Sequence, residues 1–215
     1  MIPTTAIPLT SPALFPADPA RPGGALGTAD WKRLWRDAIR DPRELLALLG
    51  LEDLLGERVS DAAAAQFPLR VPRGFAARMR HGDPHDPLLR QVLPLDDEMR
   101  LVPGFALDAV GDAQARTAAG VLQKYRGRAL LVTTGACAVH CRYCFRRHFP
   151  YGEDTATRDG WHPAVETIRA DDSVEEVILS GGDPLSLSTG KLRELTTALA
   201  GIPHLKRLRI HSRLP

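Results

Sequence analysis

The chain has 215 residues, of which 44% are hydrophobic and 25% charged, values typical of a globular protein that can bury one or two cores. Its formal net charge of +2 is too small to indicate a nucleic-acid or membrane partner, and no apolar run reaches the length of a transmembrane helix. The N-terminus lacks the basic and apolar regions of a secretory signal, which predicts a cytoplasmic protein with reduced thiols.

The first half of the chain predicts a mobile arm followed by a small helical region. Residues 1–29 are rich in Pro, Ala and Gly and predict the arm. Apolar residues at helical spacing predict a helix from an Asp30 cap to Ile39. Further helices are expected over 42–49, between an Asp41 cap and a Gly50 stop, and over 62–66 and 75–80. Frequent prolines exclude long elements, so residues 30–110 form the helical region.

The second half, residues 111–215, shows alternating helix and strand patterns. Helices are predicted at 113–125, 163–170 and 189–200, and strands at 129–134, 177–180 and 207–211. This alternation predicts an α/β fold with a parallel sheet, whose active site would lie at the carboxyl ends of the strands. The loops that follow the three strands contain the cysteines, Gly181-Gly182-Asp183 and Ser212-Arg213.

The chain has three cysteines, all in the run Cys137-Ala-Val-His-Cys141-Arg-Tyr-Cys144. Three clustered thiolates suit iron–sulfur or zinc chemistry, and an odd number in a reducing compartment argues against disulfides. A structural zinc site or a fully ligated 4Fe–4S cluster normally takes four protein ligands. Three ligands therefore predict a 4Fe–4S cluster with one open iron, or a zinc site completed by His140 or His148.

Ser180-Gly181-Gly182-Asp183-Pro184 follows the second predicted strand. Two glycines let a backbone approach a ligand closely, and an adjacent acid could bind an ammonium group. A tight turn after a strand would use the same residues. Because the cysteines end the neighbouring strand, we favour a binding role for Gly181, Gly182 and Asp183.

The cysteine run resembles the CxxxCxxC signature of the radical S-adenosylmethionine superfamily. The segment Cys144-Phe-Arg-Arg-His-Phe149 and the approach Lys124-Tyr-Arg-Gly-Arg128 resemble lysine 2,3-aminomutases. Four segments are similar to the branch that forms (R)-β-lysine for elongation factor P: Arg70-Val-Pro-Arg73, Asp86-Pro-Leu-Leu-Arg-Gln-Val-Leu93, Cys144-Phe-Arg-Arg-His-Phe-Pro-Tyr151 and Lys206-Arg-Leu-Arg-Ile-His-Ser-Arg-Leu-Pro215.

This resemblance implies an isomerase that moves the amino group of L-lysine from C2 to C3. In the family, the three cysteines ligate a 4Fe–4S cluster, and a Gly-Gly-Glu type motif binds S-adenosylmethionine at the position of Gly181, Gly182 and Asp183. By position, Arg146 would bind the lysine carboxylate, and Lys124 and Arg128 would approach pyridoxal 5′-phosphate. A flavodoxin- or ferredoxin-type electron donor, elongation factor P and its β-lysyl ligase are the implied partners.

The resemblance also implies a partial (β/α) barrel, yet only three strands of its parallel type are predicted before Pro215. The family's Schiff-base lysine has no counterpart among Lys32, Lys124, Lys191 and Lys206. The expectation is therefore a truncated, N-terminal part of the barrel that is inactive alone. Two alternatives stay open at this point: a glutamate or arginine 2,3-aminomutase, since Arg146 suits any α-amino acid, and a non-catalytic zinc-binding fragment.

Overall fold

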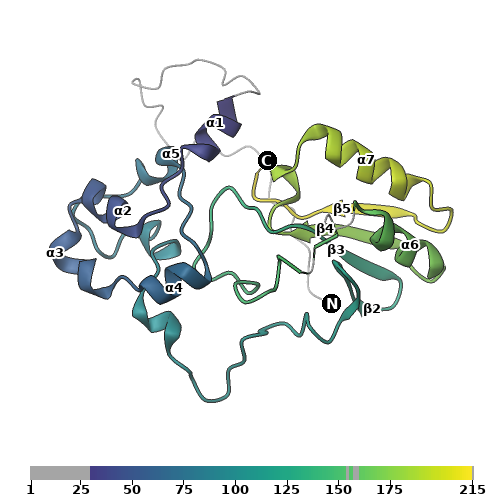
Figure 1. Cartoon of the computed structure of the whole chain (residues 1–215), viewed down its shortest axis with the longest axis horizontal. Helices are drawn as coiled ribbons and strands as arrows, with labels where there is room; N and C mark the ends of the chain where they lie inside the picture. The colour runs from purple at the N-terminus through teal and green to yellow at the C-terminus, as the bar shows by residue number, and fades with distance from the viewer. Residues whose placement is uncertain (1–29, 154, 157–159, 215) are drawn as a thin grey trace, which may run out of the picture.

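A computed structural model describes residues 30–153, 155–156 and 160–214, which form a helical half and a sheet half side by side (Figure 1). The arm predicted over residues 1–29 lies outside the described residues. No helix within the described ranges has the length and apolar character needed to cross a bilayer.

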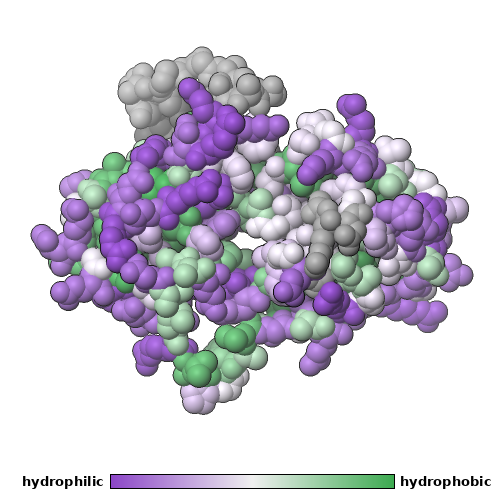
Figure 2. Space-filling view, viewed as in Figure 1, coloured by the Kyte–Doolittle hydropathy of each residue, from purple (hydrophilic) through white to green (hydrophobic). Residues whose placement is uncertain are grey.

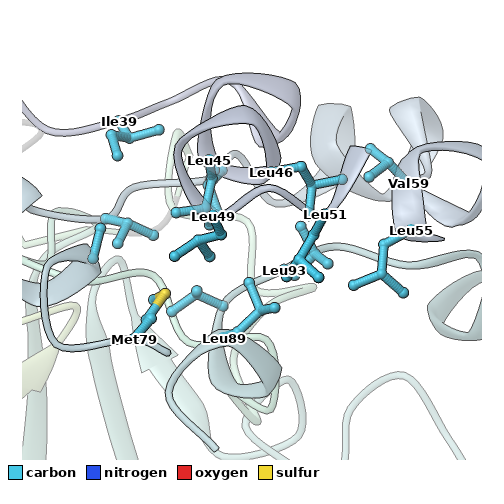
Figure 3. Close-up of a cluster of buried hydrophobic side chains, with 14 residues drawn as sticks. Ile39, Leu45, Leu46, Leu49, Leu51, Leu55, Val59, Met79, Leu89 and Leu93 are labelled. Carbon is cyan, nitrogen blue, oxygen red and sulfur yellow. The ribbon is translucent and has the colours of Figure 1, made fainter. Parts of the chain in front are cut away.

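The helical half contains five short α-helices and three 3-10 turns. The α-helices are α1 (Asp30–Arg36), α2 (Pro42–Leu49), α3 (Glu52–Leu55), α4 (Asp61–Gln66) and α5 (Arg73–Ala76). The 3-10 turns are η1 (Gly56–Arg58), η2 (Leu89–Gln91) and η3 (Asp96–Met99). Their leucines pack into one core, including Leu45, Leu46 and Leu89 (Figure 3). Burial of these side chains, rather than intrinsic helix propensity, stabilises helices this short.

Helix α2 begins and ends where the sequence predicts. The Asp41 side chain accepts a hydrogen bond from the Arg43 N–H at 2.9 Å, and Gly50 adopts φ +64° at the C-terminal cap. Helix α4 is confirmed with its start at Asp61, and α5 covers Arg73–Ala76 instead of 75–80.

Helix α1 ends at Arg36, so the predicted extension to Ile39 is wrong. The N–H of Ile39 donates to the Val71 carbonyl at 2.8 Å, and the N–H of Val71 donates back at 2.9 Å. This bridge leaves Ile39 only 1% exposed in the helical core. A long-range backbone pair and the burial of Ile39 therefore override the local helical pattern.

The sheet half contains five strands in the order β1-β2-β3-β4-β5. They are β1 (Arg116–Ala118), β2 (Val121–Tyr125), β3 (Arg128–Thr134), β4 (Glu176–Gly181) and β5 (Arg207–Ile210). The pairs β3–β4 and β4–β5 are parallel, as predicted. Helices α6 (His162–Ala170) and α7 (Thr189–Ala200) pack on the face that carries Leu131, Val177 and Leu179. The α/β class is confirmed, whereas the partial barrel and the domain boundary near residue 110 stay predictions.

The helix predicted over 113–125 is wrong, because this segment forms β1 and β2, an antiparallel addition to the sheet. Gly120 turns the chain between the two strands with φ +70°, and a side chain there would overlap the Ala156 backbone. Val121 and Leu122 are 1% and 2% exposed. Pairing with β3 and burial on both faces decide the conformation, against an alanine-rich sequence that favours a helix.

The segment between η3 and β1 connects the two halves and exposes apolar side chains to solvent. Leu101 and Phe105 are 89% and 83% exposed. They belong to the projecting loop whose green surface lies at the lower edge of Figure 2. Neither core covers this loop.

Candidate functional site

The cysteine loop leaves the carboxyl end of β3 and rests on the helical half. The Trp35 indole N–H donates to the Cys137 carbonyl at 3.0 Å. The His140 N–H donates to the Arg70 carbonyl at 3.1 Å, and the Arg142 N–H donates to the Gln91 carbonyl at 2.7 Å. Hydrogen bonds to three separate segments of the helical half therefore fix the loop between the two halves.

Side-chain packing around Trp35 and His140 strengthens this contact between the cysteine loop and the helical half. The Arg70 guanidinium lies 4.0 Å from the Trp35 ring centroid, a cation–π geometry. The ring of His140 packs on Phe67, and its Nδ1 lies 2.7 Å from the Pro68 carbonyl. His140 therefore contacts the helical half through its ring and through Nδ1.

The three thiols lie close enough to influence one another electrostatically. The pKa of Cys137 is raised to about 12, chiefly by burial and also by the neighbouring Cys144, Asp183 and Cys141. Burial also raises the pKa of Cys141, against the opposing effect of the Arg213 guanidinium. Thiolates in this setting need a cationic partner, and metal coordination supplies one.

The three thiols are soft donors of the kind that a 4Fe–4S cluster or a zinc ion takes. Within the described residues, no group of three or more His, Cys, Asp and Glu side chains converges on a point where one metal ion could sit. A 4Fe–4S cluster takes one thiolate per iron, so its ligands need not converge on one point. A Cys3His zinc site would require that convergence, and the cluster and the zinc site both stay predictions.

The loop after β4 packs directly on the cysteine loop. The Gly182 N–H donates to the Thr134 carbonyl at 2.6 Å, and the Asp183 N–H donates to the Ala136 carbonyl at 2.7 Å. A side chain at Gly182 would overlap the Ala136 carbonyl, and Gly181 adopts φ +115°. Protein packing alone thus requires glycine here, and the predicted cofactor role of Gly181 and Gly182 stays a prediction.

Asp183 joins the loop after β4 to the loop after β5. Its Oδ1 accepts from the Leu185 N–H at 3.0 Å and from the Ser212 hydroxyl at 2.7 Å, and its Oδ2 accepts from the Arg213 N–H at 2.6 Å. The side chain is buried, with 4% of the residue exposed. The carboxylate is therefore engaged within the protein, and its predicted contact with a methionyl ammonium group stays a prediction.

The structure brings the three predicted loops to one cavity of about 340 Å³. Its walls include Cys137, Gly182, Asp183 and Arg213, together with Phe75 and Gln91 of the helical half. The Arg213 guanidinium also donates to the Cys141 sulfur. Sequence reasoning missed Phe75 and Gln91, because nothing local marks a residue that approaches the loops from the other half.

Arg146 is buried beside an acid that sequence reasoning missed. Its Nε donates to Asp112 Oδ2 at 2.6 Å, and its Nη1 donates to the Ser180 hydroxyl at 3.2 Å. Lys124 Nζ lies 2.6 Å from Asp112 Oδ1. Asp112 is 2% exposed and thus holds two predicted basic residues in one buried network.

Arg128 lies further along the same sheet face, where its Nε is 2.8 Å from Glu176 Oε1. Arg207 and Arg209 on β5 also face Glu176, each at 3.4 Å. Lys124, Arg128 and Arg146 line one small cavity of about 110 Å³. The structure therefore brings together the three basic residues to which the resemblance assigns pyridoxal phosphate and substrate.

Tyr151 is another residue near the cysteines to which sequence reasoning assigned no role. Its hydroxyl donates to the Gly181 carbonyl at 3.1 Å, and burial raises its pKa well above the ordinary value. The ring packs over Gly135, where a Cβ would lie 2.9 Å from Tyr151 Cβ. Tyr151 therefore supports the loop after β4 close to Cys144 and Cys137.

No known family model matches the chain. Among curated proteins, it is similar to several that are named L-lysine 2,3-aminomutase. It is 50% identical over 189 residues to that of Escherichia coli K12, a match covering 86% of this chain and 54% of the relative. The Haemophilus influenzae relative is 45% identical over 186 residues, a match that covers 86% of this chain and 55% of the relative. The Clostridium subterminale relative is 28% identical over 187 residues, a match that covers 86% of this chain and 45% of the relative. The chain spans about half the length of these curated relatives.

Proposed function

The chain belongs to the L-lysine 2,3-aminomutase family, and from that premise we propose that its cysteine loop and adjoining cavity form the cofactor site of a radical S-adenosylmethionine aminomutase that converts L-lysine to β-lysine. One observation carries the proposal. The cysteine loop, Gly182-Asp183 and Arg213 border a single cavity at the carboxyl ends of parallel strands, where the ligand sites of such sheets lie.

Two groups of residues around that cavity would each hold one cofactor. Cys137, Cys141 and Cys144 would hold a 4Fe–4S cluster, and Gly181, Gly182 and Asp183 would border the methionyl end of S-adenosylmethionine. When bound, these groups and pyridoxal 5′-phosphate would supply the organic radical and the carbonyl that accepts the migrating amino group. Because the two loops border the same cavity, they would hold these two groups next to each other.

Arg146 is the proposed partner of the substrate carboxylate. A planar guanidinium suits bidentate carboxylate binding, and the bond from Nε to Asp112 fixes its orientation. Arg146 also borders a larger cavity of about 250 Å³, lined by Phe145 and Phe149 among others, from which a substrate could reach it. Lys124 and Arg128 are the proposed partners of the pyridoxal phosphate, because they share the smaller cavity with Arg146.

The biological setting is part of the same proposal. Reduced thiols and a cluster require a reducing compartment, so we place the protein in the cytoplasm, where a flavodoxin- or ferredoxin-type donor would supply electrons. The motifs from Arg70 to Pro215 support a role in forming β-lysine for elongation factor P and its ligase.

Anaerobic reconstitution with iron and sulfide tests the cofactor site. We expect about four irons per chain, a broad visible absorption bleached by dithionite, and reductive release of 5′-deoxyadenosine from S-adenosylmethionine. Cys141→Ala should abolish all three. A Cys141→Ala variant with a full cluster would contradict the ligand assignment.

The aminomutase step is tested on a chain that extends to the length of the relatives. That protein is incubated anaerobically with S-adenosylmethionine, pyridoxal phosphate, reductant and either lysine, glutamate or arginine. Chromatography should find β-lysine from lysine alone. A β-amino acid from glutamate or arginine would instead assign the other aminomutases of the superfamily, and no product would reject the proposed reaction.

A further inference from the structure

Glu98 is a half-buried acid that lies outside the cavity walls and contacts the cysteine loop. It belongs to η3 in the helical half, and its side chain is 10% exposed. Its Oε1 accepts from the Leu95 N–H at 3.1 Å and forms an ion pair with Arg142 Nε. Its Oε2 accepts from Arg147 Nη1 at 3.0 Å. One carboxylate therefore holds two arginines through separate oxygens.

Both arginines belong to the cysteine loop and bracket its last cysteine. Arg142 directly follows Cys141, and Arg147 comes three residues after Cys144. Arg147 Nη1 donates to the Arg142 carbonyl at 3.2 Å, and the Arg147 N–H donates to the Cys144 carbonyl at 3.1 Å. The segment around Cys144 is thus closed on itself, and Glu98 ties the closed segment to the helical half.

We propose that Glu98 is a positioning residue for the iron–sulfur cluster: by holding Arg142 and Arg147, it fixes where the Cys141 and Cys144 thiolates meet the irons. The inference rests on the proposed cluster site. It adds a role for an acid of the helical half that touches neither the thiolates nor the cavity.

The energetics favour such a role. The side chains of Arg142 and Arg147 are 21% and 10% exposed, so their bonds to Glu98 are partly shielded from water. Charge-assisted hydrogen bonds of this kind are stronger than neutral ones. Loss of the shared acid leaves two partly buried cations without an anionic partner. The cations would repel each other, and the segment that carries Cys144 would lose its anchor.

The charge balance points the same way. Two guanidinium groups around one carboxylate leave a net positive charge beside the anionic cluster. Charged groups next to metal ligands influence the properties of the bound metal. Glu98 sets both the amount of that charge and its distance from the sulfurs. A merely structural acid would affect unfolding without altering the cluster's own properties.

The test compares Glu98→Gln with Asp96→Asn on the reconstituted chain. Asp96 lies in the same 3-10 turn, is exposed, and loses the same charge when changed. Cluster loss to an iron chelator is followed anaerobically by visible absorption, and the reduced cluster is examined by electron paramagnetic resonance. Glu98→Gln should lose its cluster roughly tenfold faster than wild type and show altered g-values, whereas Asp96→Asn should match wild type.

The remaining outcomes separate this inference from the proposed function. A wild-type chain that binds no cluster rejects the proposed function, and the inference with it. If the wild type binds a cluster and Glu98→Gln shows the same rate of cluster loss and the same spectrum, the inference is overturned and the proposed function stands. If Glu98→Gln does not fold, Arg147→Lys is the variant to measure, because it keeps the charge but loses the planar fork. Faster cluster loss in Arg147→Lys supports the positioning role, and a wild-type rate overturns it.

Discussion

The N–H of Arg213 donates to Oδ2 of Asp183 at 2.6 Å, which joins the loops that follow β4 and β5. The two residues are 30 positions apart, and the Arg213 guanidinium continues to the Cys141 sulfur after β3. Through this pair, the ends of three parallel strands act as one wall of the cavity that Cys137 and Asp183 border. The stability of that wall can be measured without any cofactor.

Asp183→Asn should weaken this wall. The amide keeps one acceptor oxygen but directs an NH2 group at an N–H donor, so a buried donor loses its partner at a cost of about 1–3 kcal/mol. Urea unfolding of the apo chain at neutral pH measures the change. Ser212→Ala removes only one of the three bonds and should cost about 1 kcal/mol or less. Equal unfolding free energies for wild type and Asp183→Asn would contradict this account of the wall.

Gly182→Ala should damage the cysteine loop directly. The added Cβ overlaps the Ala136 carbonyl, so the loop must shift, which we expect to cost roughly 1–3 kcal/mol and to lower the cluster content after reconstitution. Iron analysis and urea unfolding measure both effects. Gly190→Ala is the matched control, because nothing lies within 4 Å of a Cβ there and its helix position favours alanine. Normal cluster content in Gly182→Ala would show that the loop tolerates the shift.

Asp112→Asn should be among the most destabilising single changes in the sheet half. It leaves the 6% exposed Arg146 and the partly buried Lys124 without their anionic partner, and breaking a buried pair from one side costs about 3–5 kcal/mol. Urea unfolding measures the loss. Asp61→Asn breaks the solvent-exposed pair with Arg43 and should leave the unfolding transition near that of wild type. The interpretation of a coupled network fails if the two variants behave alike.

Asp86 should make stability depend on acid pH. Burial is the largest influence on its carboxyl and opposes ionisation, but the N–H groups of Leu89, Arg80 and Leu88 together hold its pKa below the ordinary value. A carboxyl with a depressed folded-state pKa contributes stability that is present above the unfolded value, near pH 4, and is lost as the pH falls through the folded value.

The measurement for Asp86 is urea unfolding of wild type and Asp86→Asn between pH 7 and pH 2. The stability difference should be full at pH 7 and shrink below about pH 4, because protonation removes the advantage of the charged carboxylate. Comparing the two proteins at each pH cancels the titration of other acids. A difference that stays constant down to pH 2 would mean that the hydrogen bonds, not the charge, account for the effect of Asp86.

The sequence by itself determined the features that are encoded locally. The Asp41 cap and the Gly50 stop of α2 follow from the backbone conformations those residues favour. The buried runs of β3 and β4 are β-branched and apolar, and the Asp30 start and the bounds of α7 followed from spacing. Because parallel strands end at the same edge, the order of elements alone also predicted that the loops after β3, β4 and β5 would meet.

Only the tertiary structure decided the features that depend on distant partners. Residues 113–125 became strands because β3 was available for pairing, and Ile39 left its helix because Val71 offered a backbone partner. The partners Asp112 and Arg146 are 34 residues apart, and Glu98 and Arg147 are 49 apart. Separations of this size leave no periodic or capping signal, and the free energy that fixes such pairs arises only when folding excludes water from both side chains.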